Sequence, residues 1–141
     1  MTILDTNVLS ELMRSSPSPE VVAWVERNLS SELFISTITQ AEILFGIALL
    51  PDGKRKNDLM IASQMMFEKD FDRRILPFDQ IAAQHYATIA SSRKNSGNPI
   101  SQFDAQIAAI AKSRGAKVST RNEMDFSNCG ITVVNPWKFE T

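Results

Sequence analysis

Three acidic residues stand in parts of the sequence that otherwise look buried. Asp5 follows the short apolar stretch 2–4, and Glu42 and Asp104 each lie at helical spacing from apolar residues. The neighbours at these spacings are Ile38, Phe45 and Leu49 for Glu42, and Ile100, Ile107, Ala108 and Ala111 for Asp104. Buried carboxylates that converge repel one another, so such a group requires a compensating cation. Because these ligands are all oxygens, Mg²⁺ or Mn²⁺ suits them.

Each acid alone also has a purely structural explanation. Asp5 could cap a helix, which aspartate does well. Glu42 could reach water from the edge of an apolar face, and Asp104 in a first helical turn would favour the helix dipole. A functional site therefore requires the three acids to lie together.

Other catalytic chemistries find little support in the composition. The chain has one cysteine, Cys129, and one histidine, His85, so it offers no Cys/His cluster for zinc. A serine–histidine triad would depend on His85, for which we expect a packing or surface role in the middle of a helix. A single cysteine excludes an intrachain disulfide and fits a reducing cytoplasm.

The size and charge of the chain set further bounds. Its 141 residues suit a single domain over 1–141, and a net charge of −1 provides no global basic field for nucleic acid. If the substrate is RNA, it must be held by local basic patches and by metal. No apolar run approaches the roughly 20 residues that span a membrane, and the acid at position 5 leaves no room for a signal-peptide core. We therefore expect a cytoplasmic protein.

Short apolar strands alternate with helices along the chain. The pattern predicts strands at 2–4, 33–36, 74–77, 116–119 and 131–134. It predicts helices at 8–14 with Asn7 as N-cap, from Pro19, from a capping box at 37–40 to about Leu50, over roughly 53–70, from Asp79 to near Asn95, and at 101–114 with Gly115 as the stop. This alternation favours an α/β fold with a mostly parallel sheet. Sites in such sheets form outside the carboxyl ends of the strands, where Asp5 and 120–122 would meet.

Seven motifs occur in order along the chain. They are L-D-T-N-V-L-S-E (4–11), S-T-I-T-Q-A-E-I-L-F-G-I (36–47), L-L-P-D-G-K-R-K (49–56), I-L-P-F-D (75–79), D-A-Q-I-A-A-I-A (104–111), V-S-T-R-N-E-M-D-F (118–126) and V-V-N-P-W (133–137). In these motifs the chain resembles PIN-domain nucleases, especially the VapC-type and FitB-like toxins of bacterial toxin–antitoxin pairs. The resemblance implies a three-layer α/β/α sandwich around a central, mostly parallel sheet.

The resemblance also implies a site. The acids of the family correspond to Asp5, Glu42 and Asp104, and Thr120 resembles a hydroxyl that orients them. Thr6 and Asn7 are expected to shape the turn at Asp5. The fourth acid of the family is replaced by Asn122, with Asp125 three residues further on, so a second metal ion is less secure.

The activity that the resemblance implies is Mg²⁺- or Mn²⁺-dependent endonucleolytic hydrolysis of RNA. Asp5 and Asp104 would be direct metal ligands, and Glu42 either a ligand or the acceptor of a proton from water. Arg121, Lys54 and Arg55 are candidates for binding phosphates, although a solvated face is the default interpretation of the run 54–56. The implied partners are a second copy of the chain and a small VapB-like antitoxin that blocks the acidic pocket.

Two other interpretations stay open from the sequence. The acids could serve a nuclease or phosphohydrolase that acts on DNA or on another phosphoester. Asn122 leaves room for a catalytically weak module that only binds an antitoxin or RNA. A phosphoacceptor domain using Asp5 as its nucleophile is disfavoured, because the sequence shows no evident supporting lysine.

Overall fold

Five short strands pair in parallel at the centre of the computed structural model, which describes residues 1–140. They are β1 (Thr2–Leu4), β2 (Leu33–Ser36), β3 (Ile75–Leu76), β4 (Lys117–Ser119) and β5 (Val133–Val134). Their order is β3-β2-β1-β4-β5, so the first strand lies in the middle of the sheet. Ile3 pairs with Phe34 on one side and with Val118 on the other. The prediction of a mostly parallel sheet is confirmed.

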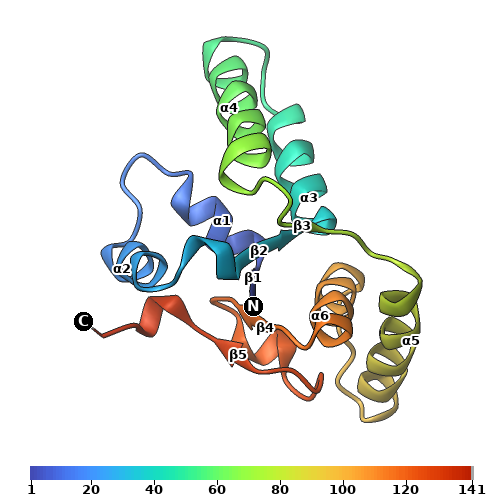
Figure 1. The fold of residues 1–141 in the computed structure, drawn as a ribbon. Helices are drawn as coiled ribbons and strands as arrows, with labels where there is room; N and C mark the ends of the chain where they lie inside the picture. The colour runs from blue at the N-terminus through green and yellow to red at the C-terminus, as the bar shows by residue number, and fades with distance from the viewer. Residues whose placement is uncertain (141) are drawn as a thin grey trace.

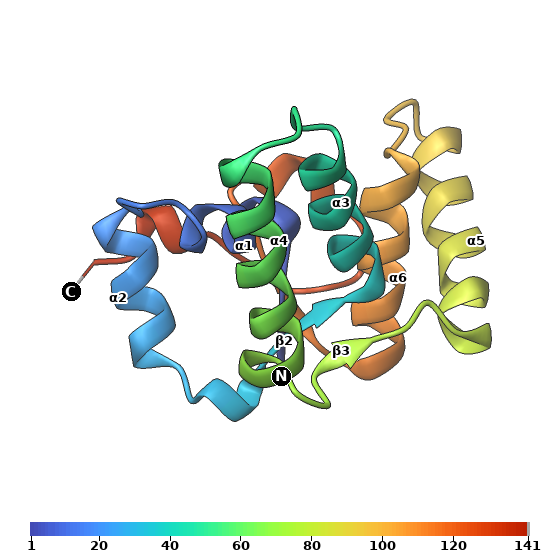
Figure 2. The same ribbon diagram turned by 90° about the horizontal axis from the view of Figure 1, so that it is seen from above.

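Six α-helices connect these strands. They are α1 (Thr6–Leu12), α2 (Pro19–Arg27), α3 (Thr37–Ala48), α4 (Lys54–Met65), α5 (Gln80–Asn95) and α6 (Gln102–Arg114). Helices α1 to α4 pack on one face of the sheet, whereas α5 and α6 lie side by side on the other (Figure 1). The view from above shows the same separation (Figure 2). This is the expected three-layer α/β/α arrangement.

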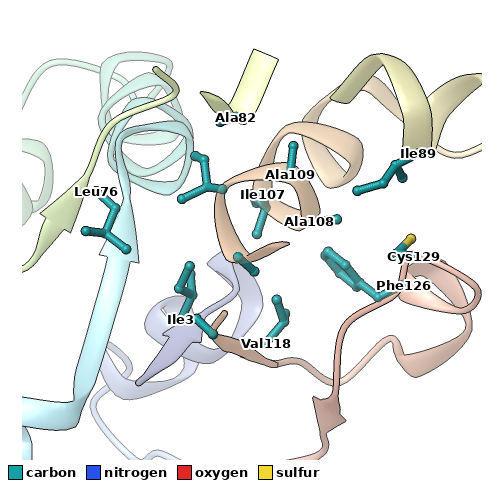
Figure 3. Close-up of a cluster of buried hydrophobic side chains, with 13 residues drawn as sticks. Ile3, Leu76, Ala82, Ile89, Ile107, Ala108, Ala109, Val118, Phe126 and Cys129 are labelled. Atoms are coloured by element: carbon teal, nitrogen blue, oxygen red, sulfur yellow. The ribbon is translucent and has the colours of Figure 1, made fainter. Parts of the chain in front are cut away.

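Side chains alternate between the two faces along β1, as a strand requires. Ile3 packs with α5 and α6, together with Val118, Ile107 and Phe126 (Figure 3). Its neighbour Leu4 points into the opposite core, which α1 to α4 complete. Both side chains are almost fully buried, which anchors the strand whose end carries Asp5.

Two predicted helix caps are wrong by one or two residues. Helix α1 is capped by Asp5, whose side chain accepts a hydrogen bond from the backbone of Thr6, and Asn7 already lies inside the helix. Helix α3 is capped by Ser36, which accepts from the backbone of Thr39, so the cap precedes the predicted box at 37–40. In both cases the strand leads directly into the helix, and a polar residue at the end of the strand or just after it takes the cap position.

The other helix boundaries follow the sequence signals. Pro19 is the first residue of α2, Asp79 caps α5 through the backbone of Ala82, and Gly115 ends α6 with a φ of 63°. Helix α4 continues into a π-helical segment, η2 (Met66–Asp70), in which Phe67 is buried. The remaining short segments are the 3₁₀ helices η1 (Ser30–Glu32), η3 (Glu123–Phe126) and η4 (Pro136–Lys138). In residues 1–140, no helix has the length and hydrophobicity needed to cross a membrane.

Candidate active site

Asp5 lies at the carboxyl end of β1 and is only 6% exposed. Its Oδ1 accepts a hydrogen bond of 2.8 Å from the backbone nitrogen of Thr6, and its Oδ2 accepts one of 2.8 Å from the hydroxyl of Thr120. Burial nevertheless raises the pKa of Asp5 from its ordinary value of 3.8 to about 6, and the charges of Asp104 and Glu42 act in the same direction. Asp5 therefore caps a helix and, within residues 1–140, is an acid that forms no ion pair with a basic side chain.

Glu42 is placed by α3 and by the side chain of Thr6. The Thr6 hydroxyl donates to Glu42 Oε1 at 2.8 Å and lies 3.0 Å from the Thr39 hydroxyl. The buried side of α3 consists of Thr39, Ile43 and Ile47. Phe45 and Leu49, which the sequence placed with Glu42 in an apolar stripe, are 65% and 68% exposed. The reasoning from a buried stripe is therefore wrong, although Glu42 itself is half-buried and lines the acidic site.

Asp104 lies in the first turn of α6, the position that favours the helix dipole. Its backbone nitrogen donates to the hydroxyl of the N-cap Ser101 at 3.2 Å. The side chain is half-buried, and Ile107 and Ala108 beyond it are fully buried. Burial raises the pKa of Asp104, the Ser101 hydroxyl lowers it, and the charge of Asp125 raises it.

The Thr120 hydroxyl joins three segments around Asp5. While it donates to Asp5, it accepts from Asn7 Nδ2 at 3.3 Å and from the backbone nitrogen of Asn122 at 3.1 Å. Asn7 also accepts from the backbone nitrogen of Arg121 at 3.3 Å. Thr6 and Thr120 thus contact Asp5 directly, and Asn7 contacts Thr120 and the backbone of Arg121.

The three acids open into one pocket of about 520 Å³ at the carboxyl edge of the sheet. Its lining also includes Thr6, Asn7, Ser10, Glu11, Arg14, Arg121, Asn122 and Trp137. Asn122 therefore lines the same pocket as the acids, whereas Asp125 does not line it. Glu11 and Trp137 were not predicted from the sequence, although each is the last residue of one of the seven motifs, 4–11 and 133–137. Within residues 1–140, no three His, Cys, Asp or Glu side chains form a ready-made metal cage.

Comparison with known proteins identifies the family. The model of the PIN-domain family matches residues 2–130. The chain belongs to the PIN-domain family. It is 42% identical over 137 residues to the toxin FitB of Neisseria gonorrhoeae, which covers 97% of this chain and 99% of FitB. It is 38% identical over 138 residues to the VapC ribonuclease Y4jK of Sinorhizobium fredii, with 98% and 99% covered. The crystal structure of FitAcB from N. gonorrhoeae superposes with a TM-score of 0.93 at 41% identity, over 99% of this chain and 100% of that one.

A second hollow of this PIN domain extends from the acidic pocket. This groove, of about 1040 Å³, shares Thr6, Ser10, Arg14 and Glu42 with the pocket and runs between α1, α3 and α4. Lys54 and Arg55 line the groove and not the pocket, and Lys54 forms an exposed ion pair of 2.8 Å with Asp58. Arg121 lines the pocket itself, with its guanidinium 5.1 Å from the ring centre of Trp137.

Proposed function

We propose that this PIN domain is a Mg²⁺-dependent endoribonuclease and the toxin of a VapBC-type toxin–antitoxin pair. The observation that carries the proposal is the convergence of Asp5, Glu42 and Asp104, from three different elements, on one pocket. The names of the relatives support RNA as the substrate, since one is a VapC ribonuclease and others are tRNA-specific endonucleases.

The acidic pocket suits a divalent cation by the chemistry of its ligands. Asp5 is buried with both oxygens hydrogen-bonded, and its raised pKa indicates a negative charge that its surroundings do not neutralise. All candidate ligands are oxygens, which Mg²⁺ prefers. Because Mg²⁺ keeps several waters and uses one or two carboxylates, it does not need a cage of three acids. Asp5 and Asp104 are the proposed ligands, with Asn122 as an uncharged fourth position.

The remaining polar groups have distinct proposed roles. When bound, Mg²⁺ lowers the pKa of water and neutralises phosphate charge. Glu42, held by the Thr6 hydroxyl, either joins the ligands or accepts the proton of the attacking water. Arg121 at the pocket and Lys54 and Arg55 in the groove bind phosphates of the RNA.

The proposed partners are an antitoxin and a second copy of the chain. Support comes from the relative FitB, which is named a toxin, and from the related structure of FitAB bound to a DNA fragment, with a TM-score of 0.93. By analogy, an antitoxin of this chain would block the acidic pocket, and co-purification of the two proteins would test the pairing.

The decisive experiment compares substrates and variants in the same assay. Purified protein is incubated with Mg²⁺ or Mn²⁺ and single-stranded RNA, structured RNA or DNA. We expect metal-dependent cleavage of RNA that Asp104→Asn reduces by at least about a hundredfold, whereas Asp72→Asn, an exposed control outside the pocket, cleaves normally. Cleavage of DNA but not of RNA would make DNA the substrate. Equal cleavage by wild type and Asp104→Asn would contradict the proposed active site.

A cellular comparison separates catalysis from binding. If the protein acts by cleavage, expression of wild type arrests growth and expression of Asp5→Ala does not. Equal arrest by both would support a binding module in place of a ribonuclease.

A further inference from the structure

A fourth acid of the pocket is not accounted for by the proposed metal site. Glu11 lines the same pocket as Asp5, Glu42 and Asp104 and is only 7% exposed. Its Oε2 accepts a hydrogen bond of 2.9 Å from the backbone nitrogen of Ser18, just before α2. That hydrogen bond, followed by those of Arg14, keeps the pKa of Glu11 below its ordinary value. Glu11 is therefore an ionised acid whose oxygens already have partners.

The other partner of Glu11 is Arg14, one helical turn further along. Arg14 Nη1 lies 3.2 Å from each oxygen of the Glu11 carboxylate. The Arg14 side chain is 66% exposed, and its Nε and Nη2 form no hydrogen bond with residues 1–140. Because a guanidinium carries five N–H donors, contact with Glu11 leaves donors for a second anion.

Arg14 lies where the acidic pocket meets the groove, so a second anion at this junction would be within its reach. Arg14 is the one basic residue that lines both the acidic pocket and the larger groove, as far as residues 1–140 are concerned. Asp5 and Asp104 line only the pocket, Glu42 lines both hollows, and Lys54 and Arg55 line only the groove. A phosphodiester chain that places one phosphate at the acids and continues into the groove passes Arg14 in between.

We propose that Glu11 is a positioning residue that holds Arg14 at the junction of pocket and groove, where Arg14 binds an RNA phosphate next to the one being cleaved. This inference rests on the proposed ribonuclease function and adds the path of the substrate. The Arg14 side of the ion pair is exposed, so the guanidinium can contact a phosphate while it stays paired with Glu11. Glu11 orients the guanidinium, which lowers the entropy lost when the phosphate binds.

Steady-state kinetics on a short single-stranded oligoribonucleotide with Mg²⁺ tests this inference. Arg14→Met is expected to raise KM about tenfold with kcat changed less than about twofold, because charge-assisted contacts to a phosphate away from the reacting atoms favour binding. Glu11→Gln, which keeps an acceptor for Ser18 but loses the charge, is expected to raise KM about threefold to fivefold. The double variant should match Arg14→Met alone, since Glu11 acts through Arg14.

Controls separate the possible outcomes. Arg114→Met removes an exposed arginine of α6 outside both hollows and should leave KM unchanged. Arg14→Lys retains the charge but lacks the planar fork of donors, so it should raise KM less than Arg14→Met does; it serves as the second variant if Arg14→Met folds poorly. Normal KM for Arg14→Met, or additive effects in the double variant, would overturn the inference while wild-type cleavage still supports the ribonuclease. Weakened Mn²⁺ binding in Glu11→Gln would make Glu11 a metal ligand and also overturn it. A wild-type protein that cleaves no RNA would contradict the proposed function itself, and this inference with it.

Discussion

Thr120 and Asp5 are joined by a hydrogen bond of 2.8 Å across 115 residues of sequence. The contact exists because β1 and β4 are neighbouring parallel strands, so the residues that follow them emerge at the same edge. The backbone nitrogen of Asp5 also donates to the carbonyl of Ser119 at 2.9 Å. The pairing of the two strands therefore fixes both the place of the Asp5 carboxylate and the hydroxyl that contacts it.

Replacement of Thr120 by valine removes this hydroxyl with little change of shape. We expect the free energy of unfolding to fall by about 1–3 kcal/mol, because buried polar groups lose their partner. In the wild type, the hydrogen bond from Thr120 lowers the pKa of Asp5. Loss of that bond should therefore raise this pKa further. The acid limb of the metal-dependent rate profile should then move to higher pH.

Urea unfolding and a pH–rate profile measure the two effects of Thr120→Val. Thr88→Val is the matched control, because the Thr88 hydroxyl is exposed and contacts only a carbonyl of its own helix at 3.4 Å. An unchanged acid limb in Thr120→Val would mean that Asp5 does not limit the reaction at low pH.

The pH dependence of stability should reveal Asp5 without any substrate. Its folded-state pKa of about 6 lies above the ordinary 3.8, so the folded protein binds more protons than the unfolded chain between these values. The contribution of Asp5 to the free energy of unfolding is therefore greatest below pH 4. It falls by about 3 kcal/mol as the pH rises through 6. Asp5→Asn should unfold less readily than wild type at pH 7, in the absence of divalent metal.

The difference in unfolding free energy between wild type and Asp5→Asn, measured from pH 4 to 8, isolates this group from the other acids. It should be close to zero at pH 4 and approach its full value above pH 6. A wild type that is more stable than Asp5→Asn at pH 7 would show that the site stabilises the negative charge of Asp5.

Strand order and helix connections explain how much of the site was predictable. Asp5, Asp104 and Thr120 follow or begin regular elements, and in a parallel sheet such positions meet at one edge whatever the details of packing. Glu42 was found for a reason that proved wrong, because periodicity alone does not show which side of α3 the core occupies. Exposed Phe45 and Leu49 fit the helical period as well as the buried Ile43 and Ile47 do.

The periodicity of apolar residues could not identify Glu11 as a pocket residue. Its role depends on the chain reversing after α1, so that the backbone of Ser18 reaches its carboxylate. Such a turn depends on tertiary geometry and leaves no regular pattern of apolar residues. The same applies to Trp137, which reaches the pocket from a 3₁₀ helix after the last strand.

The uncharged fourth position offers a gain-of-function prediction. Asn122 lines the pocket, so Asn122→Asp adds a carboxylate that faces Asp5, Glu42 and Asp104. We expect Mn²⁺ affinity to rise about tenfold, because ligand charge strengthens the binding of hard cations. Without metal the variant should be less stable than wild type, since the added charge repels the others.

Thermal unfolding with and without Mn²⁺ measures both changes, because a ligand that binds only the folded state raises the transition temperature. Asn57→Asp, an exposed substitution on α4 outside the pocket, controls for charge alone. If the two variants respond equally to Mn²⁺, Asn122 does not lie at the metal site.

The buried side chain of Arg93 anchors the segment that follows β4 and carries Asn122. Its side chain is 3% exposed, and its guanidinium donates to the carbonyls of Asn98, Asp125 and Ser127 at 2.7, 3.0 and 2.9 Å. It thereby ties the turn between α5 and α6 to the segment that follows β4. Arg93→Met leaves these partly buried carbonyls without the Arg93 donor and should lower the free energy of unfolding by about 2 kcal/mol.

Hydrogen exchange tests whether this effect is local. Amides of residues 122–129 should lose more protection in Arg93→Met than amides of α3, because that segment loses its anchor while the opposite core is untouched. Arg93→Lys should fall between wild type and Arg93→Met, since an ammonium lacks the planar fork that reaches both segments. Arg114→Met, which removes an exposed arginine from α6, should change neither quantity. Uniform loss of protection across the protein in Arg93→Met would instead assign Arg93 to global stability, with no separate effect on the segment beside the pocket.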